Sequence, residues 1–214
     1  MTETSVSFKK FPKITRLNKD VIVTEKIDGT NATVFIEDFK TNQDGDEVIV
    51  SSSLLSNKTV AIRAGSRNRW LTPKDDNFGF LKWVSENAEI LANLRPGWHR
   101  GEWYGKGIQH GYGLEEKRLA LFNPYEFQHK FYASLKDAAG NLQLLALKAL
   151  LQTVPIITIG PIDTAPKFAM KKLQTEGSQM VPGQKAEGII VYNPNSKTYY
   201  KDTFDCPTGK WADK

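Results

Sequence analysis

The stretch VIVTEKIDGTNATVFI, residues 21–36, decides the fold class because it contains two apolar, β-branched runs separated by a turn signal. Val21–Ile27 and Ala32–Ile36 are predicted strands, and Asp28-Gly29 between them is a strong turn pair. Lys26 therefore lies where a buried strand meets a loop. A nucleophilic lysine must be neutral, and desolvation together with nearby cations lowers the pKa of such a lysine from about 10.4. Lys26 is either a candidate nucleophile or a surface lysine at the end of a strand.

Further short runs of β-branched and aromatic residues predict a mostly antiparallel β structure. Six more strands are expected, at residues 47–50, 98–104, 119–127, 154–159, 188–192 and 198–201. Apolar residues at helical spacing predict helices within 78–94, 142–151 and 165–173. Because strands and helices mix without regular βαβ alternation, we expect an α+β fold of antiparallel sheets with flanking helices. The sequence contains no repeat, low-complexity tract or linker, so residues 1–214 are predicted to form a single domain.

Composition excludes several classes of protein. Hydrophobic residues make up 40% of the chain, which is enough for a sizeable core. The single cysteine, Cys206, excludes an intramolecular disulfide and argues against an oxidising compartment. Because the N-terminus lacks a signal-peptide pattern and no run approaches the roughly 18 apolar residues of a membrane span, we expect no membrane partner. The expected location is the cytoplasm, or the host cytoplasm for a viral protein.

The charge of the chain is compatible with a polyanionic partner. The formal net charge is +5, and basic residues gather in two places. Arg63, Arg67 and Arg69 lie near Trp70, and a second group lies in the first twenty residues: Lys9, Lys10, Lys13, Arg16 and Lys19. Such segments either follow phosphates or solvate a surface.

Several motifs, in order along the chain, resemble those of the covalent nucleotidyltransferases, the superfamily of DNA ligases, RNA ligases and mRNA capping enzymes. Lys26-Ile27-Asp28-Gly29 resembles the nucleophile motif. The further matches are Ser66–Arg69, Arg100–Trp103, Arg118–Asn123, Lys185–Val191 and Tyr199–Asp202. Residues 66–80 and 101–109 look most like the ATP-dependent RNA ligases. The resemblance therefore implies an ATP-grasp-like adenylation (nucleotidyltransferase) domain.

The resemblance also implies a catalytic role for three residues. Lys26 would attack ATP and carry AMP as a lysyl-AMP intermediate, and Lys201 would contact the α-phosphate. Glu187 precedes an apolar run, where a carboxylate is costly to bury unless it is paired or metal-bound. Glu187 and Glu102 are the expected ligands of Mg²⁺ or Mn²⁺. Tyr199 stands where the family pattern has another lysine, so either Lys197 substitutes from nearby or that contact is absent.

Other matching residues are expected to hold the nucleotide. Phe122 would stack on adenine, Arg67 would bind the ribose or a phosphate, and Glu102 would contact the ribose or the metal environment. Gly29 would allow positive φ close to the nucleotide. The remaining expected contacts of the nucleotide are Glu25 and Asp28, of which Asp28 could instead fix the loop after the nucleophile.

The expected partner is RNA or DNA with 5′-phosphate and 3′-OH ends. Arg69, and Lys106 in the glycine-rich segment 105–113, are the expected nucleic-acid contacts. Because the chain ends at residue 214, no OB-fold domain is expected after Asp202, and a partner protein could supply its function. Three alternatives stay open: a DNA ligase, a GTP-using capping enzyme, and a module that binds nucleotide and ends without sealing them.

Overall fold

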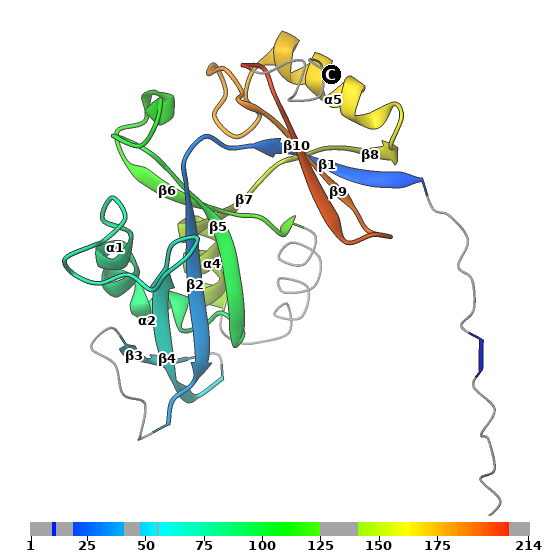
Figure 1. Cartoon of the computed structure of the whole chain (residues 1–214). Coiled ribbons are helices and arrows are strands. Elements are labelled where there is room, and N and C mark those ends of the chain that lie inside the picture. Colours follow the sequence, from blue (N-terminus) through cyan, green and yellow to red (C-terminus); the bar gives the residue numbers. More distant parts are fainter. Residues whose placement is uncertain (1–9, 12–18, 41–47, 55, 125–140, 206–214) are drawn as a thin grey trace, which may run out of the picture.

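The computed structural model describes residues 10–11, 19–40, 48–54, 56–124 and 141–205. Cys206, residues 125–127 of one predicted strand, residue 47 of another and most of the N-terminal basic group lie outside them. In the described residues the chain forms two mainly antiparallel sheets with helices packed against each (Figure 1), which confirms the expected α+β class. No helix in this part of the chain is long and apolar enough to span a bilayer.

The smaller sheet has the strand order β10-β9-β1-β8, and every neighbouring pair is antiparallel. Its strands are β1 (Asp20–Lys26), β8 (Ile156–Pro161), β9 (Gly188–Asn193) and β10 (Thr198–Thr203). Helix α5 (Ala165–Glu176) covers one face, because Ala165, Ala169 and Leu173 recur every four residues and are buried. They pack with Val21 and Val23 of β1. Since side chains alternate along a strand, Lys26 lies on the face away from α5.

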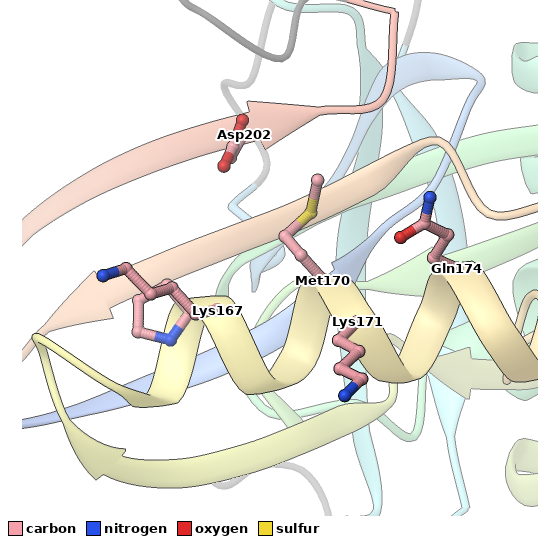
Figure 2. Close-up of a pocket in the computed structure, with 6 residues that line it drawn as sticks. Lys167, Met170, Lys171, Gln174 and Asp202 are labelled. Carbon is pink, nitrogen blue, oxygen red and sulfur yellow. The ribbon is translucent and has the colours of Figure 1, made fainter.

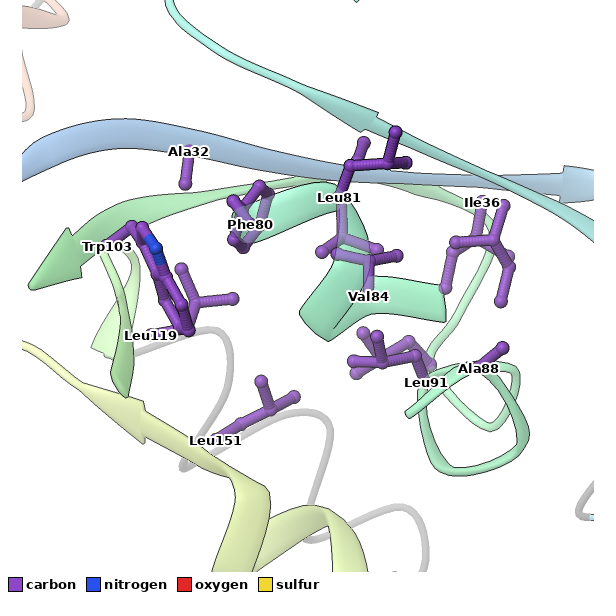
Figure 3. Close-up of a cluster of buried hydrophobic side chains, with 14 of the residues drawn as sticks. Ala32, Ile36, Phe80, Leu81, Val84, Ala88, Leu91, Trp103, Leu119 and Leu151 are labelled. Atoms are coloured by element: carbon purple, nitrogen blue, oxygen red, sulfur yellow. The ribbon is translucent and has the colours of Figure 1, made fainter. Parts of the chain in front are cut away.

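The larger sheet has the strand order β3-β4-β2-β5-β6-β7, in which only β6 and β7 are parallel. Its strands are β2 (Thr30–Asp38), β3 (Ile49–Ser53), β4 (Lys58–Gly65), β5 (Gly97–Gly105), β6 (Lys117–Leu121) and β7 (Leu151–Thr153). The main core lies on one face, where Ala32, Val34 and Ile36 of β2 meet Phe80 and Leu91 (Figure 3). The helices on this face are α1 (Phe80–Glu86), α2 (Ala88–Leu91) and α4 (Asn141–Leu150).

The two sheets meet where β1 runs into β2 (Figure 1). Only Ile27, Asp28 and Gly29 separate these strands, so the chain leaves one sheet and enters the other directly after Lys26. A third buried cluster fills the junction and consists of Ile27, Tyr104, Tyr112, Ala120 and Val154. Tyr112 comes from the short 3-10 helix η1 (Gly111–Gly113). The junction therefore places the end of β1 beside β5.

Three features differ from the sequence-based expectations. Strands β4 and β7 were not predicted, and residues 119–127 were predicted as one strand, whereas β6 ends at Leu121. The predicted helix within 78–94 is interrupted at Asn87, which separates α1 from α2. It begins only at Phe80 because Asn77, Phe78 and Gly79 have left-handed φ values of 46°, 60° and 84°.

Candidate active site

Lys26 and Glu187 form the centre of the candidate site. The Lys26 Nζ lies 2.5 Å from both carboxylate oxygens of Glu187, and both side chains are about one-fifth exposed, at 22% and 20%. The antiparallel pairing of β1 with β9 brings them together, since Lys26 is opposite Gly188 and Glu187 immediately precedes it. Two of the three residues that were predicted to be catalytic are thus in direct contact.

Glu102 approaches the same place from the larger sheet. It lies on β5 and pairs with Asn31 of β2. Asn31 is two residues after Gly29. Burial raises the pKa of Glu102 to about 7; Lys26 opposes this rise, and the carboxylates of Glu187 and Asp28 add to it. The pKa of Glu102 therefore depends on the charges of all three of these predicted site residues.

Gly29 is required here for a different reason from the one expected. It is not among the glycines with positive φ, so the expectation of a left-handed backbone was wrong. Instead, a Cβ atom at residue 29 would lie 2.5 Å from the Trp103 carbonyl oxygen and 2.8 Å from Cγ of Glu102. Only a residue without a side chain lets the backbone after Lys26 pass this close to β5.

Asp28 is tied to the glycine-rich segment 105–113. Its carboxylate bonds to the His110 ring nitrogen Nδ1, and its backbone N–H donates to the Tyr112 hydroxyl at 2.8 Å. Tyr112 is buried and packs edge-on against Tyr104. Sequence reasoning assigned no such role to Tyr112 or His110. Their separation of more than eighty residues from Asp28 leaves no local signal that could have found the contact.

Glu25 lies on the opposite face of β1 from Lys26. Only 1% of it is exposed, and its carboxylate accepts hydrogen bonds from the Ser178 hydroxyl (2.5 Å) and from the backbone N–H groups of Gln179 (2.8 Å) and Met180 (3.0 Å). Burial raises its pKa, whereas these three bonds lower it. Glu25 thus anchors the loop after α5, and its expected contact with the nucleotide stays a prediction.

Lys201 shares a face with Lys26. On β10 it pairs with Ile190, which pairs with Thr24 of β1, two residues from Lys26. Figure 2 shows the neighbouring Asp202 on the α5 side of β10, where it lines a pocket with Lys167, Met170 and Lys171. Since neighbours on a strand point to opposite faces, Lys201 is directed away from α5.

Tyr199 and Lys197 lie farther from Lys26 along the same hairpin. Tyr199 stacks on Tyr192 with ring centroids 4.6 Å apart, so an aromatic contact occupies the position where the family pattern has a lysine. Lys197 lies in the turn between β9 and β10, beyond the pairing of Asn193 with Thr198. At about 3.3 Å per residue, this turn is roughly 17 Å along the sheet from Lys26. That distance exceeds the reach of a lysine side chain.

The remaining predicted residues lie in the segments that follow strands β4, β5 and β6 of the larger sheet. Phe122 follows Ala120 on the face of the larger sheet that carries Glu102, and 39% of it is exposed. Arg67 is exposed in the turn after β4. Arg69 forms a bidentate ion pair with Asp75, both contacts being 2.6 Å, and Lys106 pairs with Glu115 at 3.0 Å. These two basic residues are on the surface, and their contact with nucleic acid stays a prediction.

Comparison with known protein families decides between the superfamily branches. A family model described as RNA ligase matches residues 19–211, which is nearly the whole chain. The chain belongs to the RNA ligase family. This family match spans every candidate site residue from Lys26 to Lys201. No match was found among curated proteins.

Solved structures of an RNA ligase share the fold. Mutants of Naegleria gruberi RNA ligase match with TM-scores of 0.52 for an apo form, 0.53 for a form with ATP and Mn, and 0.55 for a form with AMP and Mn. Sequence identities are 21%, 19% and 20%, and each match covers 92% of this chain. The chain spans about half the length of these structures, which it covers to 52–53%.

The carboxylates of this RNA ligase family member suit a divalent cation that is shared with a bound phosphate. Among the described residues, no group of three or more His, Cys, Asp or Glu side chains is arranged to hold a metal. Magnesium, however, is commonly held by one or two carboxylates together with water and substrate phosphates. Glu187 and Glu102, which face Lys26 from two sheets, match that requirement in number and chemistry.

We expect Glu102→Gln to change stability in a pH-dependent way. Because the pKa of Glu102 is higher in the folded protein than its ordinary value, its contribution to stability is full below about pH 4.5 and is lost as pH rises through about 7. Glutamine imitates the neutral form. The variant should therefore exceed the parent protein by up to about 3 kcal/mol near pH 8, and the difference should shrink toward pH 5.

Urea unfolding across this pH range, in buffer without divalent cations, measures the effect. Glu89→Gln is a matched control, because Glu89 is exposed in α2. A stability difference between Glu102→Gln and the parent protein that is independent of pH would contradict the assignment.

Proposed function

We propose that this chain is an ATP-dependent RNA ligase that acts through AMP bonded to Lys26. The observation that carries the proposal is the contact of Lys26 with Glu187 at the junction of the two sheets, beside Glu102, in a member of the RNA ligase family. Naegleria gruberi RNA ligase structures with ATP and Mn, and with AMP and Mn, support a nucleotide and a divalent cation as ligands.

The first chemical step joins AMP to the protein. The neutral Lys26 amine attacks the α-phosphorus of ATP, an N–P bond forms, the bond to the leaving pyrophosphate breaks, and the nitrogen releases a proton to solvent. Glu187, 2.5 Å from Nζ, is the acceptor in position to receive the proton that the ammonium must lose. When bound, Mg²⁺ or Mn²⁺ held by Glu187 and Glu102 would neutralise negative charge on the phosphates.

Two further steps would complete sealing. A 5′-phosphate oxygen of the nucleic acid attacks the phosphorus of lysyl-AMP, which restores Lys26 and transfers AMP to the strand end. The 3′-OH of the adjoining strand then attacks the activated 5′-phosphorus, and AMP leaves. These steps depend mainly on positioning and charge stabilisation. Phe122, directly after β6, and Arg67, in the turn after β4, are the residues that we assign to adenine and to a ribose or phosphate.

Lys201 is expected to be needed for AMP transfer, whereas Lys197 is not. Lys201 lies on the Lys26 face of the smaller sheet, where an ammonium stabilises charge on the α-phosphate in the transition state. We expect Lys201→Ala to slow adenylylation by about 10²- to 10³-fold. Lys197→Ala removes the same charge at the tip of the same hairpin and should retain the parent rate. Single-turnover formation of labelled protein measures both rates, and equal losses in both variants would contradict the assignment.

The proposed function is tested by intact mass and by sealing. After incubation with ATP and Mg²⁺, the protein should gain the mass of one AMP, and GTP should give no adduct. Sealing is then compared on nicked duplexes with RNA or DNA at the 3′-OH side, and faster sealing of RNA is expected. A protein that binds ends without gaining AMP would be a binding module, and preference for a DNA 3′-OH would instead identify a DNA ligase.

A further inference from the structure

An exposed aromatic cluster lies on the same sheet face as Glu102. Phe35 of β2 pairs with Trp98 of β5, and their ring centroids are 4.6 Å apart. Trp70 stacks on Trp98 with centroids 5.4 Å apart and an interplanar angle of 18°. Phe35, Trp70 and Trp98 are called the aromatic platform below. The main core and its helices lie on the other face of the sheet. Val34 and Ile36, which flank Phe35 on β2, point toward that core.

The local backbone is shaped to place Trp70 over this sheet. Residues 65–70 form a turn closed by a bridge between Gly65 and Trp70, and the Ser66 N–H donates to the Arg69 carbonyl oxygen at 2.9 Å. A Cβ atom at Gly65 would lie 3.3 Å from Cε3 of Trp70, so the glycine leaves space for the indole. Yet 57% of Trp98 and 38% of Trp70 remain exposed. Two stacked indoles left this open to water are typical of a binding surface.

Four arginines lie around the platform, and two of them are paired with acidic residues. The Arg100 guanidinium lies 5.3 Å from the centre of the Trp98 ring, in a cation–π contact. Arg63, on the same face of β4, pairs with Glu37 at 3.7 Å, and Arg69 pairs with Asp75 at 2.6 Å. Arg67 is exposed in the same turn as Trp70. Aromatic rings interleaved with arginines suit stacked bases together with their phosphates.

The platform is continuous with the candidate active site. On the face of β5 away from the main core, the side chains in order are Trp98, Arg100, Glu102 and Tyr104. Their exposure falls along the strand, from the exposed Trp98 to the fully buried Tyr104. Trp98 lies four residues from Glu102, about 13 Å along the strand. That distance equals roughly four stacked nucleotides at about 3.4 Å each. A strand end beside Glu102 would therefore place bases a few nucleotides away over the platform.

We propose that the aromatic platform binds single-stranded RNA by stacking unpaired bases on Trp98 and Trp70, with Arg100 contacting the phosphates. The inference rests on the proposed function for the position of the strand end, but stacking itself does not require catalysis. A protein partner is disfavoured because the arginines lie on the same strand and turn as the aromatic rings, and this strand, β5, continues to Glu102 in the candidate active site.

The test separates RNA binding from adenylylation. Binding of a single-stranded RNA of about 12 nucleotides is measured by fluorescence anisotropy for the parent protein, Trp98→Ala and Phe168→Ala. Phe168 is a matched control, since it is also 57% exposed but lies on α5 of the other sheet. We expect Trp98→Ala to weaken binding by about 10- to 100-fold and Phe168→Ala to leave it unchanged. AMP attachment to Lys26, followed by intact mass, should be unchanged in both variants.

A second measurement keeps the test independent of folding of the variant. RNA of the same length carrying 4-thiouridine is photo-crosslinked to the parent protein, and the crosslinked peptides are identified. Crosslinks to the peptides that contain Trp70 and Trp98 are expected. Unchanged RNA affinity of a folded Trp98→Ala protein, or crosslinks confined to α5, would overturn the inference. Absence of the AMP adduct in the parent protein would overturn the proposed function alone.

Discussion

Replacing Lys26 with alanine is expected to abolish attachment of AMP to the protein, so that intact mass after incubation with ATP and Mg²⁺ shows no adduct. The ε-amine supplies the nitrogen of the N–P bond. The nearest described partner of that amine is the carboxylate of Glu187, which cannot form a phosphoramide. The loss should therefore be complete, and sealing that begins from ATP should be lost with it.

Lys26→Arg separates the nucleophile from the charge. Arginine keeps a cation beside Glu187, but its guanidinium stays protonated and is not nucleophilic at neutral pH. Both Lys26 variants should therefore fail to gain AMP, while Lys58→Ala, which removes an exposed lysine paired with Asp38, should gain it normally. RNA that already carries AMP on its 5′-phosphate bypasses attachment of AMP to the protein, so it tests the sealing step of the Lys26 variants separately. Persistent labelling of Lys26→Arg would place the nucleophile at another residue.

The directions of the side chains next to Lys26, and the turn that follows it, could be predicted from sequence because they depend on local residues. Strand alternation puts Lys26 and Glu25 on opposite faces of β1, and the structure has this arrangement. The turn at Asp28-Gly29 joins the two sheets at the expected place. The contact of Lys26 with Glu187 depends instead on the register of β1 with β9, and only the motif resemblance indicated it.

Other features lack a local signal. Strand β4 contains Val60, Ala61 and Ile62 in succession, all buried, so its pattern shows no clean alternation of apolar and polar residues. The requirement for Gly29 arises from the approach of β5, more than seventy residues later, rather than from its own φ. The aromatic platform likewise joins Phe35, Trp70 and Trp98 from three separate segments. Each of these features is created by strand register across the sheet.

Glu187→Ala is expected to have the second largest effect, a fall in adenylylation rate of about 10²-fold or more. Glu187 holds the Lys26 ammonium through both carboxylate oxygens at 2.5 Å, and it is one of the two carboxylates that we assign to the divalent cation. Alanine removes the orientation of Lys26, the proton acceptor and the metal ligand together. Glu86→Ala, which breaks an exposed lysine–glutamate pair with Lys82, should leave the rate unchanged.

Glu187→Gln distinguishes orientation from metal binding. Glutamine is nearly the same size and keeps one carbonyl oxygen that can accept a hydrogen bond from Lys26, but it loses the negative charge. If Glu187 contributes to metal binding, the Mg²⁺ concentration that gives half the maximal rate should rise by about 10- to 100-fold in this variant. If it only orients Lys26, the rate should fall while the Mg²⁺ requirement stays that of the parent protein. Because the ion pair joins β1 to the start of β9, melting temperatures of both variants show whether lost activity reflects lost folding.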